Sequence, residues 1–210
     1  MFITFEGIDY SGKSTQAKLV ADRLASAGRK VMLLREPGGT ELSERIRALL
    51  LDRDAVPIDP LSELMLFSAA RAQLVREVIL PALREGTIVV CDRFYDSTTA
   101  YQGYGRNLPL DEIRTLNRLC TAGTTPDLTL FVDVDPDEIK QRKIRAGLKP
   151  DRMERSGDVF FRMVVDGYRR IARDEPDRLA VVPGHGPIAQ IHEEIWKHVE
   201  RKLSGTRSTS

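Results

Sequence analysis

The chain has 210 residues, of which 41% are hydrophobic and 30% charged, and this composition excludes a disordered or fibrous protein. Lys and Arg total 32 and Asp and Glu total 31, so no overall field draws the chain to nucleic acid or to an anionic membrane, and we expect neither partner. The length suits one compact domain, and Cys91 and Cys120 have neither the spacing of a zinc site nor the density of a disulfide framework.

The predicted elements alternate between strand and helix along the chain. Apolar runs predict strands over residues 2–5, 30–34, 87–92, 127–134 and 179–183. Helical periodicity predicts helices over residues 14–27, 41–50, 60–86, 110–122 and 191–203, with Pro81 ending or bending the third. This alternation is typical of an α/β three-layer sandwich in which helices flank a five-stranded parallel sheet. Such sheets bind ligands at the carboxyl ends of their strands.

The first strand leads into a loop that matches a phosphate-binding pattern. Residues 7–14 (GIDYSGKS) fit GxxxxGK[ST] between a predicted strand and a predicted helix, so we expect a P-loop NTPase-type fold. The glycines let backbone N–H groups turn toward phosphate, Lys13 supplies a mobile cation, and the Ser14 hydroxyl can bind Mg²⁺. The residues expected to hold the nucleoside triphosphate are Gly7, Ile8, Asp9, Tyr10, Ser11, Gly12, Lys13, Ser14 and Thr15.

The third predicted strand favours a kinase over a hydrolase. Its sequence VVCDRF places Arg93 directly after Asp92, where an ATP-driven motor usually has a second acid, and no NKxD-type guanine-reading sequence follows any strand. An acceptor that is itself a phosphate needs several cations near the γ-phosphate, and the arginine fork suits that task. Arg71 and Arg93 are the candidates, and a surface salt bridge is the alternative interpretation of each.

The basic stretch at residues 140–155 (KQRKIRAGLKPDRMER) is the one compositional anomaly. It allows two interpretations, a solvated helix end or a mobile lid that closes over the triphosphate and brings arginines to the moving phosphoryl group.

Several motifs together resemble bacterial thymidylate kinase. They are REPGGT at 35–40, the run DP-x-SEL…FSAARAQ over 59–73, DRF-x-DST-x-AYQG over 92–103, and DRME…F…GY from 151 to 168. The resemblance covers residues 1 to about 175 and implies transfer of the γ-phosphoryl group of ATP to dTMP, giving dTDP and ADP. It further implies Mg²⁺ as the cofactor and a homodimer.

The same resemblance implies roles for individual residues. Phe67 would stack on the thymine ring, although packing in the core is the alternative for an aromatic residue on an apolar helix face. Arg71 would contact the base, and Arg93 would hold the dTMP phosphate. Asp92 would hold Mg²⁺ through water beside Ser14. The implied substrate-binding set is Asp9, Pro37, Phe67, Arg71, Arg93, Thr98, Tyr101 and Gln102.

The loop carries Tyr10 and no arginine, which is similar to the branch of the family in which the lid supplies the transfer arginine. This favours the lid interpretation and makes Arg145 and Arg152 the expected catalytic arginines beside Lys13 and Arg93, with Arg142 as a competitor. The sequence PGHG at 183–186 is unusual for the adenine loop.

The expected organisation is a single kinase domain over residues 1–203, with a mobile lid at about 140–155 and a polar disordered tail over 204–210. No signal peptide pattern opens the chain, so we expect a cytoplasmic protein. The rival functions are a kinase for another deoxynucleoside or deoxynucleotide, and a catalytically weak nucleotide-binding protein.

Overall fold

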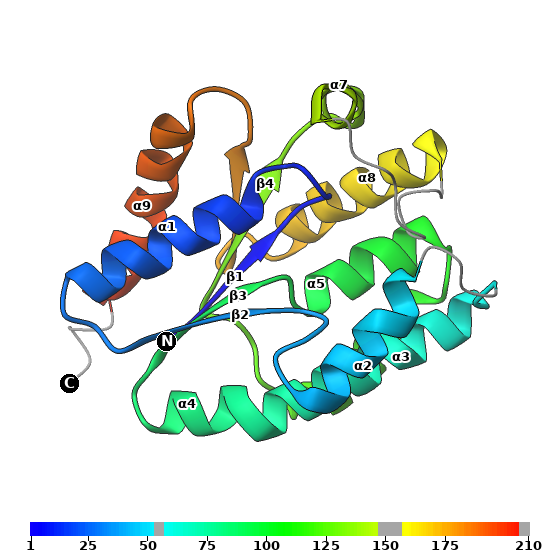
Figure 1. Ribbon diagram of the computed structural model, residues 1–210, viewed down its shortest axis with the longest axis horizontal. Coiled ribbons are helices and arrows are strands. Elements are labelled where there is room, and N and C mark those ends of the chain that lie inside the picture. Colours follow the sequence, from blue (N-terminus) through cyan, green and yellow to red (C-terminus); the bar gives the residue numbers. More distant parts are fainter. Residues whose placement is uncertain (53–56, 147–156, 206–210) are drawn as a thin grey trace.

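The computed structural model describes residues 1–52, 57–146 and 157–205, and its centre is a parallel sheet of five strands in the order β2-β3-β1-β4-β5 (Figure 1). The strands are β1 (Phe2–Glu6), β2 (Val31–Arg35), β3 (Ile88–Asp92), β4 (Leu128–Asp133) and β5 (Leu179–Pro183). The prediction of a five-stranded parallel α/β sheet is confirmed.

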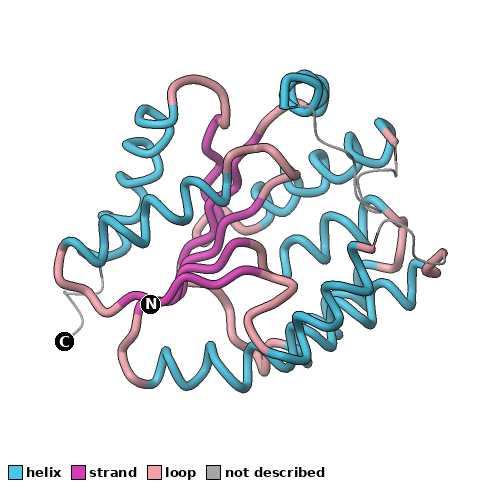
Figure 2. Tube along the Cα trace, in the orientation of Figure 1, coloured by secondary structure: helices cyan, strands magenta, loops and turns pink. Residues whose placement is uncertain are grey.

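The central strands β1, β3 and β4 are buried along almost their whole length, because helices cover both faces of the sheet (Figure 2). On β1 the two faces alternate: Ile3 and Phe5 pack with α1 (Lys13–Ser26) and α9 (Ile188–Gly205), while Phe2 packs on the opposite face. The period of two along a strand therefore places Thr4 and Glu6 on the same face as Phe2.

Most of the other helices lie on that second side of the sheet. They are α2 (Glu41–Leu51), α3 (Pro60–Leu74), α4 (Leu80–Arg84), α5 (Tyr95–Thr98), α6 (Leu110–Cys120) and α8 (Asp158–Asp174). Two π-helical turns, η1 (Val75–Ile79) and η2 (Thr99–Gly105), continue α3 and α5, and α7 (Pro136–Ala146) follows β4.

The structure differs from the predicted elements in four places. The long helix continues through Pro81 and ends at Arg84. The π-helical turn η1 ends at Ile79, two residues before this proline. The predicted elements also lack the helical structure over 95–105, 136–146 and 158–174, although the first and the last of these segments contain family motifs.

The predicted lid and tail fall largely on undescribed residues. Residues 140–146 belong to α7, and 147–155 lie outside the described residues. Of the predicted tail, Ser204 and Gly205 belong to α9, and 206–210 lie outside the description. None of the helices within the described residues combines the length and apolar character that crossing a membrane requires.

Candidate active site

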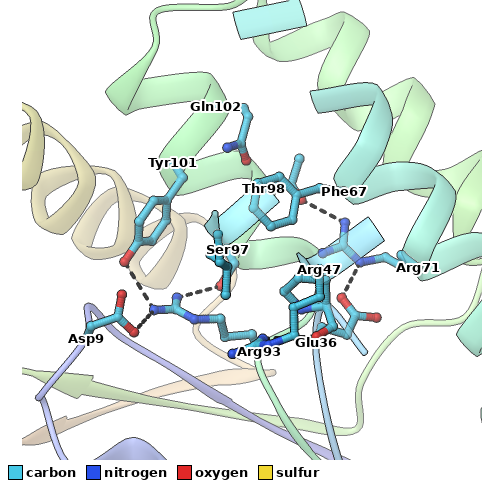
Figure 3. Close-up of a pocket in the computed structure, with 12 residues that line it drawn as sticks. Asp9, Glu36, Arg47, Phe67, Arg71, Arg93, Ser97, Thr98, Tyr101 and Gln102 are labelled. Carbon is cyan, nitrogen blue, oxygen red and sulfur yellow. Dashed lines mark hydrogen bonds and ion pairs between the residues drawn. The ribbon is translucent and has the colours of Figure 1, made fainter. Parts of the chain in front are cut away.

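A pocket opens beside the carboxyl ends of β1, β2 and β3, and all eight residues of the predicted substrate-binding set line it (Figure 3). Four further lining residues were missed by sequence reasoning: Glu36, Arg47, Leu51 and Ser97. Glu36 and Ser97 stand inside quoted motifs, so their neighbourhood was visible in the sequence. Arg47 and Leu51 lie on α2, where nothing but helical periodicity marks them.

The phosphate-binding loop has the backbone that its glycines predict. Gly7 has φ 140°, and a Cβ there would lie 2.8 Å from the Val132 carbonyl oxygen, so no larger residue fits. Gly12 has φ 96° and immediately precedes α1, whose first residue, Lys13, is buried. The Ser11 hydroxyl is buried and has no hydrogen-bond partner among the described residues. The loop therefore leaves polar groups for a ligand to satisfy.

Asp9 lies between the loop lysine and the strand-end arginine. Its Oδ1 accepts from Lys13 Nζ at 3.2 Å and from Arg93 Nη2 at 2.8 Å. Burial acts to raise the pKa of Asp9, but the charges of Arg93 and Lys13 outweigh it and hold that pKa well below its usual range. The Asp9 carboxylate thus links Lys13 of the phosphate-binding loop to Arg93 of the pocket.

Arg93 follows β3 in a left-handed turn with φ 74°, which non-glycine residues rarely adopt. Its backbone N–H donates to the Phe5 carbonyl at 2.8 Å. Its guanidinium donates to Ser97 Oγ at 3.1 Å and to the Tyr101 hydroxyl at 3.2 Å. These contacts hold a cation at the edge of the pocket facing Asp9.

Arg71 forms a buried ion pair on the other side of the pocket. Its Nε donates to Glu36 Oε2 at 2.7 Å, and its Nη1 donates to Thr98 Oγ1 at 2.7 Å. Burial raises the pKa of Glu36, and the pairing with Arg71 opposes that rise. The surface salt bridge considered for Arg71 is therefore wrong, because its side chain is 3% exposed.

The Glu63 carboxylate orients the side chain of Gln102. Its Nε2 donates to Glu63 Oε1 at 2.9 Å, and Arg106 donates to both oxygens of the same Glu63 at 3.3 Å. Since a carboxylate only accepts, the Gln102 amide oxygen is left to face the pocket as an acceptor. Phe67 is half-buried and lines the same pocket, so it is more than a core residue.

The predicted metal ligands suit Mg²⁺ held partly by water. Asp92 Oδ1 is buried without a hydrogen-bond partner among the described residues, and Ser14 is exposed on the first turn of α1. In the described ranges no group of three or more carboxylate, histidine or cysteine side chains is placed so that it could hold a metal ion by itself. This donor set fits a cation that keeps several waters and binds phosphate oxygens.

Part of the basic stretch lies against the phosphate-binding loop. Arg142 on α7 donates to the Tyr10 carbonyl at 3.2 Å and to the Gly184 carbonyl at 2.8 Å, and Lys143 lies 5.1 Å from the Tyr10 ring centre. The side chain of Arg145 and all of Arg152 lie outside the described residues.

The parallel sheet, the glycine loop and the cation-lined pocket beside it define a P-loop kinase with an anionic acceptor. A family model described as thymidylate kinase matches residues 5–195, and the chain belongs to the thymidylate kinase family. It is an ATP-dependent phosphotransferase that phosphorylates dTMP to dTDP.

Individual proteins agree with this assignment. The chain is 43% identical to the thymidylate kinase of Caldanaerobacter subterraneus subsp. tengcongensis, over 98% of each chain. It is 48% identical to that of Chlorobium luteolum, over 97% of this chain and 98% of the relative. The crystal structure of thymidylate kinase from Ehrlichia chaffeensis superposes with a TM-score of 0.78 at 40% identity, covering 95% of this chain and 98% of that one.

Proposed function

We propose that the pocket beside the sheet is the dTMP site, with the base near Phe67 and Arg71 and the phosphate at Arg93. This proposal depends above all on one observation: the eight expected substrate residues come from four separate segments of the chain and line one pocket. Arg71 offers donors to a base carbonyl, and the Gln102 oxygen offers an acceptor to a ring N–H, which matches thymine. Thr98, Tyr101 and Pro37 also line this pocket.

Catalysis in this proposal comes from alignment and charge neutralisation. The dTMP phosphate is already largely dianionic near neutral pH, because its second pKa is about 6, so no general base is required. Lys13 neutralises the transferring phosphoryl group, and Arg93 holds the acceptor. Arg47, the missed cation of the pocket, donates to the Pro37 carbonyl at 3.0 Å and adds positive charge on the same side.

Ser14 and, through water, Asp92 would hold Mg²⁺ in this site. When bound, the ion would supply positive charge that neutralises the charge developing on the phosphates. The unpaired Asp92 oxygen supports this role.

A lid at residues 140–155 would supply the transfer arginines Arg145 and Arg152, because the phosphate loop carries Tyr10 in place of an arginine. The contact of Arg142 with the Tyr10 carbonyl supports a lid anchored on this loop. We expect Arg145→Ala and Arg152→Ala each to lower kcat by about 10²-fold or more with little change in ATP affinity. Single-turnover kinetics would measure it, and an unchanged kcat in both variants would contradict the lid proposal.

Residues 1–203 would act as one kinase domain in a cytoplasmic homodimer. The helix α3 contacts both α2 and α6, and these three helices expose apolar side chains such as Leu42, Met65 and Leu119. Such side chains on connected helices suit a subunit interface.

A coupled assay with ATP and a panel of dTMP, dUMP, dCMP and dGMP tests the acceptor assignment. We expect dTMP to be preferred, with dUMP within about 10- to 200-fold, because one methyl group discriminates by only about 1–3 kcal/mol. Equal rates on purine and pyrimidine monophosphates would contradict it, and ADP release without an acceptor would indicate a hydrolase.

A further inference from the structure

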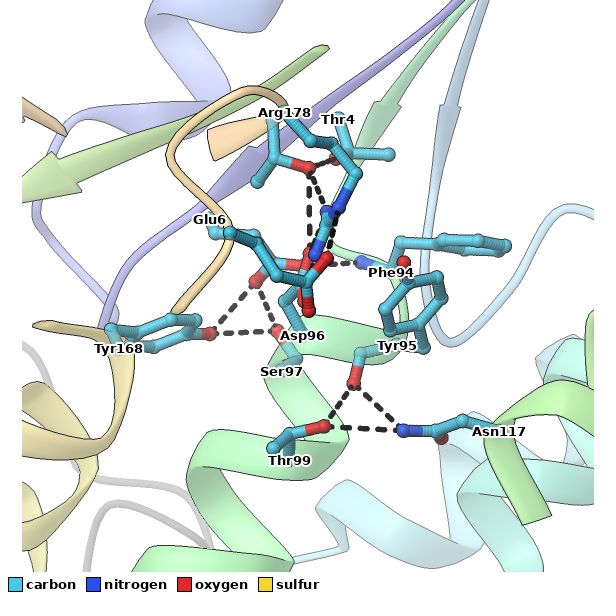
Figure 4. A network of polar contacts seen from close by, with 12 residues as sticks. Thr4, Glu6, Phe94, Tyr95, Asp96, Ser97, Thr99, Asn117, Tyr168 and Arg178 are labelled. Atoms are coloured by element: carbon cyan, nitrogen blue, oxygen red, sulfur yellow. Dashed lines mark hydrogen bonds and ion pairs between the residues drawn. The ribbon is translucent and has the colours of Figure 1, made fainter. Parts of the chain in front are cut away.

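The last residue of β1, Glu6, lies between the two halves of the active site and is fully buried. It directly precedes Gly7 of the phosphate-binding loop, and both of its carboxylate oxygens are used (Figure 4). Oε1 accepts from the Phe94 backbone N–H at 2.7 Å. Oε2 accepts from the Ser97 hydroxyl at 2.6 Å and from the Tyr168 hydroxyl at 2.8 Å.

All three donors adjoin Arg93. The Phe94 N–H follows the left-handed Arg93 residue, whose backbone conformation is unfavourable for an L-amino acid and needs contacts to maintain it. The Ser97 and Tyr168 hydroxyls accept from Arg93 Nη1 at 3.1 and 3.4 Å. Glu6 therefore supports both the backbone turn and the guanidinium of Arg93 without contacting either directly.

The direction of these hydrogen bonds depends on the Glu6 charge. Each hydroxyl has one proton, and a carboxylate that accepts both protons leaves the oxygen lone pairs of Ser97 and Tyr168 for the Arg93 N–H groups. An amide at position 6 would place an NH₂ group where Oε2 lies. The hydroxyls would then accept from that amide and direct their own protons elsewhere, toward the Arg93 cation.

We propose that Glu6 is a positioning residue for dTMP phosphorylation, which holds Arg93 in register with the phosphate-binding loop by fixing the Ser97 and Tyr168 hydroxyls as acceptors. This inference rests on the proposed role of Arg93 at the acceptor phosphate. The Glu6 side chain joins the end of β1 to the turn after β3 and to α8. A residue of the sheet would therefore align the phosphate-binding loop with the dTMP site.

The charges around Glu6 make this support sensitive to pH. Burial, and then the nearby Asp96 charge, raise the pKa of Glu6 to about 7, while Arg93 opposes the rise. Asp96 itself is paired with Arg178 at 2.7 and 2.9 Å. The other titratable groups around Glu6 in the described part of the chain are the Cys91 thiol on β3, the Tyr101 phenol on η2 and the Tyr168 phenol on α8. Burial raises the pKa of all three, so they stay neutral near pH 7.

Protonation of Glu6 adds a donor where an acceptor is needed, so activity toward dTMP should fall as pH drops below about 7. Wild type should show this loss in kcat/KM for dTMP in addition to the loss from protonation of the dTMP phosphate, whose second pKa is about 6.

The test compares Glu6→Gln with Thr4→Val, measuring steady-state kinetics between pH 5.5 and 8.5 and thermal unfolding. Thr4 lies on the same face of β1 and bonds Thr129 at 2.8 Å, so its loss loosens the strand without touching Arg93. We expect Glu6→Gln to lower kcat/KM for dTMP by about 10- to 100-fold, with KM for ATP within about threefold and an acid limb set by the substrate alone. Thr4→Val should keep the wild-type kinetics and pH profile.

Three results would overturn the inference. The first is a kcat/KM for dTMP within about twofold of wild type in folded Glu6→Gln, and the second is an acid limb in Glu6→Gln identical to that of wild type. The third is a loss of activity in Thr4→Val equal to that in Glu6→Gln. If Glu6→Gln does not fold, Tyr168→Phe removes one acceptor and should lower kcat/KM for dTMP by about three- to tenfold.

Arg93→Ala, measured in parallel, distinguishes failure of the proposed role of Arg93 from failure of the role of Glu6. If it retains dTMP activity, the proposed role of Arg93 fails; if it loses activity while the Glu6 and Tyr168 variants do not, only the role of Glu6 fails.

Discussion

Asp9 accepts from two cations at once, so its negative charge stabilises the folded site. Because its pKa is depressed in the folded protein, its contribution to stability is present above the unfolded pKa of about 4 and is lost as pH falls toward the folded value. We expect Asp9→Asn to lower the thermal midpoint at pH 7, with the difference from wild type shrinking progressively below about pH 4. Thermal unfolding across this range measures it, and a pH-independent difference would contradict the pairing.

Glu63 is a second carboxylate that accepts hydrogen bonds from two side chains. Its side chain is 1% exposed and accepts from Gln102 and Arg106, so its loss takes this acceptor away from the buried Gln102 amide. We expect Glu63→Ala to reduce the free energy of unfolding by about 2–4 kcal/mol and to raise KM for dTMP more than it changes kcat. Glu77→Ala, which removes an exposed bond to Gln73, is the matched control and should cost under about 0.5 kcal/mol.

Residue chemistry explains which site residues the sequence could predict. Arg93 and Phe67 stand in motifs that resemble those of the family, and their residue types suit phosphate and base, so the resemblance predicted both for the pocket. Glu6 was missed because a glutamate before a glycine loop looks like any strand end, and its three donors come together only when the turn after β3, α5 and α8 pack around it. Arg47 was missed because a cation on an amphipathic helix normally faces solvent.

At the level of elements, the helix α8 shows why some structure was not predicted. Its segment carries many charged residues and begins after Gly157 without a side-chain cap, so the usual start signal is missing. Tertiary contacts hold it instead, since Phe160, Val164 and Tyr168 pack into the core beside Tyr101. Strands such as β3 and β5 were predicted closely because continuous apolar runs have few alternatives inside an α/β sheet.

The closeness of α8 to η2 can be tested at Gly167. A Cβ there would lie 2.6 Å from Tyr104 Cδ2 and 2.8 Å from its Cβ, so the helices could not keep their separation. We expect Gly167→Ala to destabilise the protein by about 1–3 kcal/mol, despite the better helix propensity of alanine. Urea unfolding measures the loss. The double variant with Tyr104→Ala should recover part of it, and a more stable single variant would show that the helices are not in contact.

At the scale of the whole molecule, the parallel sheet explains how residues from distant segments form one site. The carboxyl ends of β1, β2 and β3 meet at one edge, which gathers the phosphate-binding loop, residues 36–37 and Arg93. This gathering followed from the predicted strand pattern. The orientation of each side chain did not, because it depends on helices packed across the sheet.

The proposed ATP and dTMP sites lie along one edge of the sheet. Each site should lose the thermal shift caused by its own ligand when its own cation, Lys13 or Arg93, is removed. A ligand present at 100 times its Kd stabilises the folded state by about 2.7 kcal/mol, so ADP with Mg²⁺ and dTMP should each raise the thermal midpoint. We expect Lys13→Met to lose most of the ADP shift and keep the dTMP shift, and Arg93→Ala to do the reverse. If either variant lost both shifts while remaining folded, Lys13 and Arg93 would serve a single shared site. A dTMP shift that survived Arg93→Ala would place the acceptor phosphate elsewhere along this edge.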